Sequence, residues 1–355
     1  MSKPKVLLAG VGAIGATVAA WLVGEGIDVT IMDVGETADA LRRTGITVFE
    51  IGSPESTRKT VKARVVARPG ECPDVDIVLL AVKNYNLFDV AQLVLEDLGN
   101  GKIIVSLANG RENQEILPRF FPRVIYCVVG YNARRDDAGV VGYQKKGPLL
   151  IGTPDNSLKD ELHFVQQILG RGCSTEIVDR LQDAVHTKIV MNLTNALDAL
   201  VGHGYQTLSS FPVYQHLLSQ TLWEGVRVVK AAGYHEHKIA GMPPFAVIRA
   251  SALLPGWLTR PVVRRRLRAM VMSSMTQDVM LRGAFNTELE SITGYLVKLA
   301  SQVGVPAPYN ETIYELGQKH FHPGFTPLRC EDVLRAVQET KAKRDSIQMN
   351  AGTRA

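Results

Sequence analysis

The chain has 355 residues, of which 46% are hydrophobic and 21% are charged, and its formal net charge is +5. This composition is ordinary for a soluble globular protein and argues against disorder, and the length predicts two domains. The modest positive charge fits an anionic small molecule and does not by itself indicate nucleic acid.

The cysteines and the apolar segments predict a soluble cytoplasmic protein without a membrane partner. Residues 6–23 carry no charge and superficially resemble a signal peptide, but five glycines in or beside them divide the stretch into a strand, a turn and a helix. The four cysteines are widely spaced and form no C-x-x-C motif, as expected of reduced thiols: Cys72, Cys127, Cys173 and Cys330.

A glycine motif follows the first predicted strand. Residues 6–9 form a short apolar run, and Gly10, Gly12 and Gly15 then complete G-x-G-x-x-G before a helix predicted over 13–23. In a dinucleotide-binding turn the first glycine permits the tight turn, the second lets the backbone approach a pyrophosphate, and the third lets the helix pack closely. The first helical N–H groups, from Ala13 and Ile14 onward, then face the phosphates.

An acidic residue stands where a dinucleotide site needs one. The second apolar run, residues 29–32, ends at Asp33, about 20 residues after the glycines, where a Rossmann site holds the ribose hydroxyls. The alternative interpretation is a glycine-rich turn that binds nothing. We therefore predict that a nucleotide is bound by Gly10, Gly12, Ala13, Ile14, Gly15 and Asp33.

Alternating strands and helices in the first 175 residues predict a doubly wound α/β sheet. Residues 140–143 and 148–151 read as a late antiparallel pair, and residues 158–169 as a covering helix. The other predicted helices are 36–43, 86–98 and 112–121, and the other strands are 46–51, 61–67, 76–82, 102–107 and 124–129.

From about Arg180 the pattern becomes helical. The sequence thus predicts a Rossmann domain over residues 1–178, an all-helical domain over 179–343 and a frayed tail over 344–355. The helices predicted in the second domain are 181–200, 214–232, 264–281, 287–303, 308–320 and 331–341.

Two polar residues follow buried strands on the expected ligand side of the sheet. Lys83 can meet a cofactor phosphate or ribose, or can be a solvated lysine. Asn109, followed by Gly110, can hold ribose or substrate through its amide, or can mark a plain turn.

The helical part also carries two candidate sites. Lys188, Asn192 and Asn195 share one helical face among apolar residues, a pattern that meets buried partners or lines a cleft. Glu288 opens a predicted helix, with Ser274 upstream, and taken alone it is an acid interacting favourably with the helix dipole.

Taken together, these motifs resemble the ketopantoate reductase family over nearly the whole chain. The resemblance rests on the glycine motif, Asn109-Gly110, Lys188-x-x-x-Asn192, and Ser274 upstream of Thr287-Glu288 and residues 304–310. It implies a Rossmann domain plus a helical domain with the active site in the cleft between them. It also implies NADPH-dependent reduction of 2-dehydropantoate to pantoate on the way to pantothenate, and a homodimer formed through the helical domain.

The resemblance also implies residue roles. Lys188 matches the general acid that protonates the carbonyl oxygen, and Glu288 keeps that lysine charged and binds substrate. Asn192 and Ser274 match positions that hold substrate polar groups, and Asn109 matches one at the cofactor–substrate junction. Asn195 stands one residue before the family's second asparagine position.

Three departures concern the ligand contacts. Val34 stands where the family has an arginine for the 2′-phosphate, so the sequence favours NAD over NADP unless Arg42 or Arg43 compensates. Ala196 occupies the position of that second asparagine, a rotation of about 100° from Asn195 on a helix. Residues 252–268, and the spacing from Ser274 to Glu288, also differ from the family pattern.

The leading hypothesis is a nicotinamide-dependent reductase of a 2-oxo acid, with 2-dehydropantoate as the best single substrate. The first alternative is a paralogous NAD-dependent dehydrogenase or reductase of another hydroxy or keto acid on the same fold. A second is a non-enzymatic dinucleotide-binding regulator, which would need no lysine–glutamate pair.

Two other classes of ligand are not expected. An arginine run without interleaved aromatic residues is typical of a solvated helix face rather than of a nucleic-acid site. The histidine pairs at 235/237 and 320/322 have no further ligand at metal-binding spacing. The arginines of that run are Arg260, Arg264, Arg265, Arg266 and Arg268.

Overall fold

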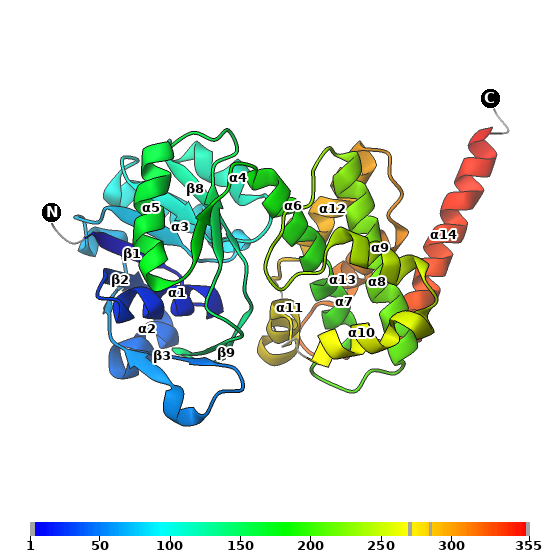
Figure 1. Ribbon diagram of the computed structural model, residues 1–355, viewed down its shortest axis with the longest axis horizontal. Coiled ribbons are helices and arrows are strands. Elements are labelled where there is room, and N and C mark those ends of the chain that lie inside the picture. The colour runs from blue at the N-terminus through cyan, green and yellow to red at the C-terminus, as the bar shows by residue number, and fades with distance from the viewer. Residues whose placement is uncertain (1–3, 269–271, 284–285, 353–355) are drawn as a thin grey trace. The chain divides into compact units, whose positions relative to one another are not determined.

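The computed structural model describes residues 4–268, 272–283 and 286–352, and the chain forms two compact units (Figure 1). The first unit comprises Met1–Val185 with Ile239–Gly241, and the second comprises His186–Lys238 with Met242–Ala355. The sequence places the domain boundary after residue 178, whereas this division falls inside helix α6 (Leu181–Asn192).

The first unit is built on a sheet with the strand order β12-β11-β8-β7-β6-β1-β2-β5. The strands from β8 to β5 in this order are parallel, and β11 joins β8 in antiparallel fashion. This is the expected doubly wound fold, and β1 and β6 flank its switch point. The strands are β1 (Lys5–Ala9), β2 (Asp28–Met32), β5 (Arg64–Val66), β6 (Ile77–Leu80), β7 (Ile103–Ser106), β8 (Val124–Val129), β11 (Leu149–Gly152) and β12 (Thr175–Ile177).

Helices predicted from the sequence connect these strands. β6, β7 and β8 are buried along their whole length, as expected of parallel strands with both faces covered. The predicted helix 112–121 is shorter than expected, because Pro118 turns its second half into a 3₁₀ segment, Leu117–Arg119. The helices are α1 (Ala13–Gly24), α2 (Gly35–Thr44), α3 (Asn84–Leu98), α4 (Asn113–Ile116) and α5 (Lys159–Gly172).

The predicted pairing of residues 140–143 with 148–151 is wrong. β10 (Val140–Tyr143) pairs antiparallel with β9 (Ala133–Asp137) and parallel with β3 (Ile46–Glu50), in a second sheet of order β4-β3-β10-β9 that also contains β4 (Lys59–Val61). Gly139, with φ of +76°, closes the tight β9–β10 turn. β11 is fully buried and lies in the main sheet beside β8.

The second unit is helical. Helix α8 lies at its centre and packs against α7, α9, α10, α12, α13 and α14. Leu197, Tyr214, Val226 and Ile313 are among the fully buried side chains of its core. Two π-helical segments, Gln277–Leu281 and Glu290–Gly294, interrupt the pattern. After α6 the helices are α7 (Thr194–Val201), α8 (Phe211–Ala231), α9 (Phe245–Leu253), α10 (Gly256–Arg268), α11 (Ser274–Thr276), α12 (Tyr295–Gln302), α13 (Pro308–His320) and α14 (Cys330–Gly352).

Two predicted helices are divided in the structure. The helix expected over 181–200 is interrupted at Leu193, where α8 approaches so closely that a Cβ on Gly225 would lie 2.4 Å from Leu193 Cδ1. The helix expected over 264–281 ends as α10 at Arg268, and residues 269–271 lie outside the described residues. A new helix, α11, then starts behind Ser273, whose Oγ accepts a hydrogen bond from the backbone N–H of Thr276 (3.1 Å).

The sequence predicted a frayed tail from residue 344, and the structure differs from this prediction. Helix α14 continues to Gly352. The guanidinium of Arg344 donates two hydrogen bonds to the carboxylate of Glu311 on α13, one of them from Nε at 2.9 Å. This bidentate ion pair attaches α14 to α13 at Arg344, the residue where the frayed tail was expected to begin.

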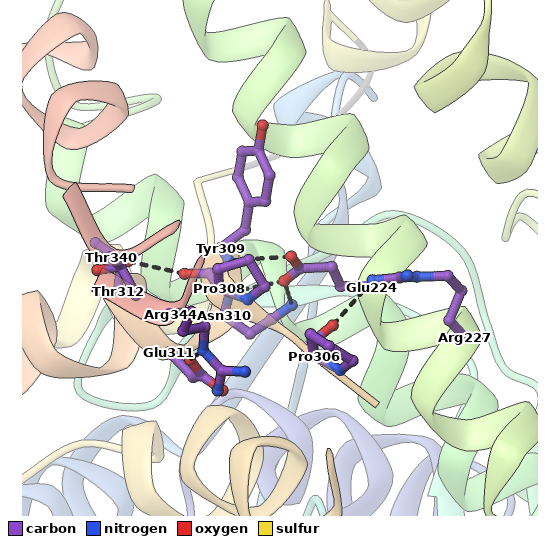
Figure 2. A network of polar contacts seen from close by, with 10 residues as sticks. All are labelled: Glu224, Arg227, Pro306, Pro308, Tyr309, Asn310, Glu311, Thr312, Thr340 and Arg344. Carbon is purple, nitrogen blue, oxygen red and sulfur yellow. Dashed lines mark hydrogen bonds and ion pairs between the residues drawn. The ribbon is translucent and has the colours of Figure 1, made fainter. Parts of the chain in front are cut away.

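A buried carboxylate holds the start of α13 (Figure 2). Glu224 on α8 is 3% exposed and accepts hydrogen bonds from the backbone N–H groups of Tyr309 (3.1 Å) and Asn310 (3.0 Å) and from Asn310 Nδ2 (3.0 Å). These bonds satisfy N–H groups that a helix N-terminus leaves unpaired. Burial nevertheless raises the pKa of Glu224 to about 7, against the lowering effect of these donors.

This shift predicts a pH-dependent stability. The folded-state pKa exceeds the unfolded value, so the contribution of Glu224 is complete below about pH 4.5 and is lost as the pH rises through about 7. From pH 5.5 to 8.0 the loss amounts to about 2 kcal/mol. Urea unfolding at these two pH values should show it, and Glu224→Gln should remove that part of the difference.

The matched control is Glu315→Gln, which removes an exposed carboxylate from the same helix that Glu224 holds. It should leave the wild-type pH dependence unchanged. An equal pH dependence in the wild type and in Glu224→Gln contradicts this account of the buried carboxylate.

Candidate active site

The glycine turn of the first unit has the geometry of an anion-binding turn. Gly10 has a φ of +93°, and a Cβ on it would lie 2.7 Å from Val82 Cγ1, at the end of β6. A Cβ on Gly15 would lie 2.0 Å from the carbonyl oxygen of Gly10, so only glycine lets α1 approach the turn. A Cβ on Gly12 would meet nothing within 4 Å, so this side of the turn is open.

The open side of the turn exposes the start of α1. Gly12 is the N-cap residue and has no side chain with which to cap the helix, and the first turn contains no acid. The leading N–H groups of α1, beginning with those of Ala13 and Ile14, therefore remain suited to bind an anionic group. These features fit the pyrophosphate of a dinucleotide.

Asp33 follows β2 and is tied to the same turn. Its Oδ2 accepts a hydrogen bond from the N–H of Val11 (2.8 Å), and its Oδ1 accepts one from the N–H of Val34 (2.8 Å). Each carboxylate oxygen retains acceptor capacity, which suits a ribose hydroxyl. Val34 is 67% exposed and puts no positive charge beside it. Arg42 pairs instead with Asp39 at 3.0 Å.

Lys83 and Asn109 follow β6 and β7, which lie next to β1 in the sheet. The structure thus brings every predicted cofactor residue to the carboxyl ends of four adjacent strands, β7-β6-β1-β2. Sequence reasoning missed the buried Asn84, whose Nδ2 donates a hydrogen bond to the carbonyl of Asn109 (2.7 Å). Asn113 Nδ2 holds the same loop through the carbonyl of Ala108 (3.0 Å).

The helical unit buries a lysine. Lys188 on α6 is 9% exposed, and this burial lowers its pKa to about 8. The carboxylate of Glu288 is close enough to act in the opposite direction and favour the ammonium form. A lysine in this environment can gain and lose a proton near neutral pH.

Glu288 is 5% exposed and lies just before the π-helical segment Glu290–Gly294. Its carbonyl accepts hydrogen bonds from the N–H of Ile292 (3.1 Å) and from Ser291 Oγ (3.3 Å). π-Helical segments often occur at functional sites. Glu288 is therefore more than a first-turn acid at a helix start, because its carboxylate acts on a buried lysine.

The candidate substrate-binding amides and hydroxyl lie on three helices, α6, α7 and α11. Asn192 is partly exposed, one helical turn beyond Lys188 on α6. Asn195 lies beyond the interruption, on α7, and is also partly exposed, whereas Ala196 is fully buried. Helix α7 packs against α11, which begins with Ser274.

Two tyrosines around a buried histidine fix the turn of α6 that carries Lys188. His186 is fully buried, its Nε2 lies 2.7 Å from the hydroxyl of Tyr295, and its ring stacks on Tyr234 with centroids 3.5 Å apart. Thr187 Oγ1 accepts a hydrogen bond from the N–H of His237 (3.0 Å). No sequence motif predicts this cluster, because its members are far apart in the chain.

Comparison with known proteins identifies the family. The sequence profile described as ketopantoate reductase PanE/ApbA matches residues 6–156, and the profile of its C-terminal region matches residues 180–320. The chain belongs to this family. It is 28% identical to the 2-dehydropantoate 2-reductase of Archaeoglobus fulgidus over 89% of this chain and 97% of the relative. It is 27% identical to that of Halobacterium salinarum over 88% and 97%.

Solved structures share the fold of this family member. A PanE/ApbA family ketopantoate reductase from Ralstonia eutropha JMP134 matches with a TM-score of 0.70 at 22% identity, over 95% of this chain and 99% of that one. A D-mandelate dehydrogenase, in a ternary structure with NADH and anilino(oxo)acetate, matches with a TM-score of 0.70 at 18% identity, over 89% and 97%. The expected fold class is thereby confirmed.

The glycine turn yields a paired prediction. Gly15→Ala should lower the free energy of unfolding by about 1–3 kcal/mol, because its Cβ meets backbone. Gly12→Ala should leave the melting temperature unchanged and weaken nicotinamide dinucleotide binding at least about ten-fold, because its methyl occupies the open side. Thermal unfolding and calorimetric titration distinguish the two effects, and Gly12→Ala binding as tightly as wild type contradicts the assignment.

Proposed function

We propose that this protein reduces a 2-oxo acid with a nicotinamide cofactor, and that its substrate is 2-dehydropantoate and its product pantoate. The observation that carries the proposal is the buried Lys188 beside Glu288, in a member of the ketopantoate reductase family. The glycine turn and Asp33 support cofactor binding. Relatives that match along most of this chain are 2-dehydropantoate 2-reductases.

In this proposal the two units supply different parts of the reaction. The cofactor, when bound, supplies a hydride to the carbonyl carbon of the substrate. Lys188 donates a proton to the carbonyl oxygen, so that the ketone becomes a secondary alcohol with one hydrogen on carbon and one on oxygen. With a pKa of about 8, its ammonium both stabilises the developing alkoxide and gives up its proton.

The neighbouring polar residues hold the substrate in this scheme. Glu288 maintains the positive charge of Lys188 against desolvation and accepts a hydrogen bond from a substrate hydroxyl. Asn192, Asn195 and Ser274 bind the remaining polar groups. Asn109, whose loop Asn84 and Asn113 hold, contacts the cofactor beside the reacting carbon.

For the cofactor we propose NAD rather than NADP. Asp33 accepts backbone hydrogen bonds through both oxygens and stays suited to a free 2′-hydroxyl, whereas it repels a 2′-phosphate. Val34 offers no cation, and Arg42 is paired with Asp39.

A second candidate function is the NAD-dependent oxidation or reduction of another hydroxy or keto acid. The observation that favours it is the Asp33–Val34 pair, together with the shared fold of a D-mandelate dehydrogenase solved with NADH. A panel of aliphatic and aromatic 2-oxo acids separates the two candidates by kcat/KM. Cofactor binding without turnover of any of them indicates a non-enzymatic regulator instead.

Lys188→Ala should lower kcat/KM for ketone reduction at least about 100-fold while cofactor binding is retained, because it removes the proton donor. Reduction by the wild type should decline as the pH rises through about 8, when Lys188 loses its proton, and alcohol oxidation should increase over the same range. Nicotinamide absorbance measures both. Lys298→Ala, which removes an exposed lysine of α12, is the matched control, and equal loss in both variants contradicts the assignment.

The cofactor proposal predicts a preference for NADH in the wild type. Val34→Arg should shift the ratio of kcat/KM values toward NADPH by about ten-fold, since it places a cation where a 2′-phosphate would lie. Val34→Gln, a polar residue without charge, should leave the ratio unchanged. A wild type that prefers NADPH overturns the interpretation of Asp33 and Val34.

A further inference from the structure

Helices α9 and α10 present apolar side chains to solvent. Leu253, Leu254, Trp257, Leu258 and Val262 form what we call the α9–α10 surface, and their exposed fractions are 61, 50, 68, 49 and 62%. Exposed apolar residues are ordinary when isolated, but these five lie within ten consecutive positions. The proposed reaction uses none of them.

The exposure follows from how α10 is attached. Gln215 Nε2 on α8 donates hydrogen bonds to the carbonyl of Gly256 (3.0 Å) and to Thr259 Oγ1 (2.8 Å). Val263 and Leu267, four residues apart, pack toward the core of the helical unit. The opposite face of α10 therefore carries the exposed residues Trp257, Leu258 and Val262, at i, i+1 and i+5.

The same segment is strongly basic. Residues 237–277 contain no aspartate or glutamate. The acid that α8 contributes, Glu224, is buried at the start of α13, so it does not neutralise α10. Arg265 is exposed on the outer face of α10, and the guanidinium of Arg264 lies 4.8 Å from the centroid of the Phe211 ring at its flank. The basic residues of the segment are Lys238, Arg249, Arg260, Arg264, Arg265, Arg266 and Arg268.

We propose that the α9–α10 surface binds the face of an anionic phospholipid bilayer. A helix with tryptophan and leucine on its outer face and with arginines in a segment without acidic residues lies in the headgroup region, where the apolar side chains reach the acyl boundary and the arginines reach the phosphates. Tryptophan is enriched at that depth of a membrane.

The combination of positive charge and apolar side chains favours a bilayer over a second copy of the chain or a nucleic acid. A two-fold contact with a second copy of the chain would set this segment against itself, and residues 237–277 contain no acid that could pair with the arginines of α10. A nucleic acid would neutralise the arginines but offers Leu253, Leu254 and Trp257 no apolar counterpart in its backbone.

The contact is with the surface of the bilayer. Among the helices of the described residues, none is long and apolar enough to cross a membrane. The sequence led us to expect no membrane partner, because glycines divide the run 6–23 and no other stretch is long and apolar enough to span a bilayer. The exposure of Leu253, Leu254 and Trp257 changes that expectation.

Flotation of the purified full-length protein with vesicles tests the proposal. Vesicles of phosphatidylcholine with about 30% phosphatidylglycerol, at about 0.1 M NaCl, should bind the protein, and pure phosphatidylcholine vesicles should bind it weakly. Leu253→Ser/Leu254→Ser should reduce binding at least about ten-fold. Arg264→Gln/Arg265→Gln should reduce it about five-fold per arginine and weaken its salt dependence.

Matched controls come from exposed residues elsewhere in the helical unit. Tyr205→Ser removes an exposed apolar side chain, and Arg335→Gln removes an exposed arginine from α14. Both should bind vesicles as the wild type does. Circular dichroism and cofactor binding, measured on every variant, exclude misfolding as the cause of a loss.

Three outcomes overturn the proposal. The wild type fails to bind anionic vesicles, or the α9–α10 variants bind as well as the controls, or sedimentation shows that Leu253→Ser/Leu254→Ser converts a dimer into monomers. The last outcome assigns the surface to a second copy of the chain. Reductase activity without lipid should be the same in all variants, so this test is independent of the proposed reaction.

Discussion

Lys188 carries its amino group into the interior of the helical unit, and this burial is the constraint on which the proposed chemistry depends. The pKa of Lys188 falls from 10.5 to about 8, which corresponds to about 3 kcal/mol of lost preference for the charged form. Without Glu288 the loss would be larger, because its carboxylate acts against desolvation. The protein thus keeps a weakly held proton in a place from which water is largely excluded.

The rest of the helical unit holds that pair in position. The contacts of His186 with Tyr234 and Tyr295 fix the middle of α6, and the close approach of Gly225 to Leu193 fixes its C-terminal end. In the first unit the candidate cofactor contacts come from backbone at the glycine turn after β1, and from the side chains of Asp33, Lys83 and Asn109, which follow β2, β6 and β7.

The sequence predicted what depends on local pattern. The glycine motif, the buried parallel strands and most helices follow from residue spacing, and the structure confirms them. The sequence could not predict which strand pairs with residues 140–143, because hydrophobic alternation does not reveal which sheet a strand joins. The sequence also did not reveal the interruption at Leu193, where α8 approaches closely. Nor did it reveal the outward apolar face of α10, whose inner face carries Val263 and Leu267 and is bonded to Gln215 of α8. The candidate site residues came from motifs, whereas their supporting residues Asn84 and His186 have no sequence signal.

The most direct test of the account is a measurement of the pKa of Lys188. The ¹⁵N chemical shift of its Nζ, followed over pH in protein labelled at lysine and assigned with Lys188→Arg, reports this value separately from turnover. The account predicts a pKa of about 8 for Lys188 in the wild type and a lower pKa in Glu288→Gln. A wild-type pKa at the ordinary lysine value, or one that Glu288→Gln leaves unaltered, contradicts it.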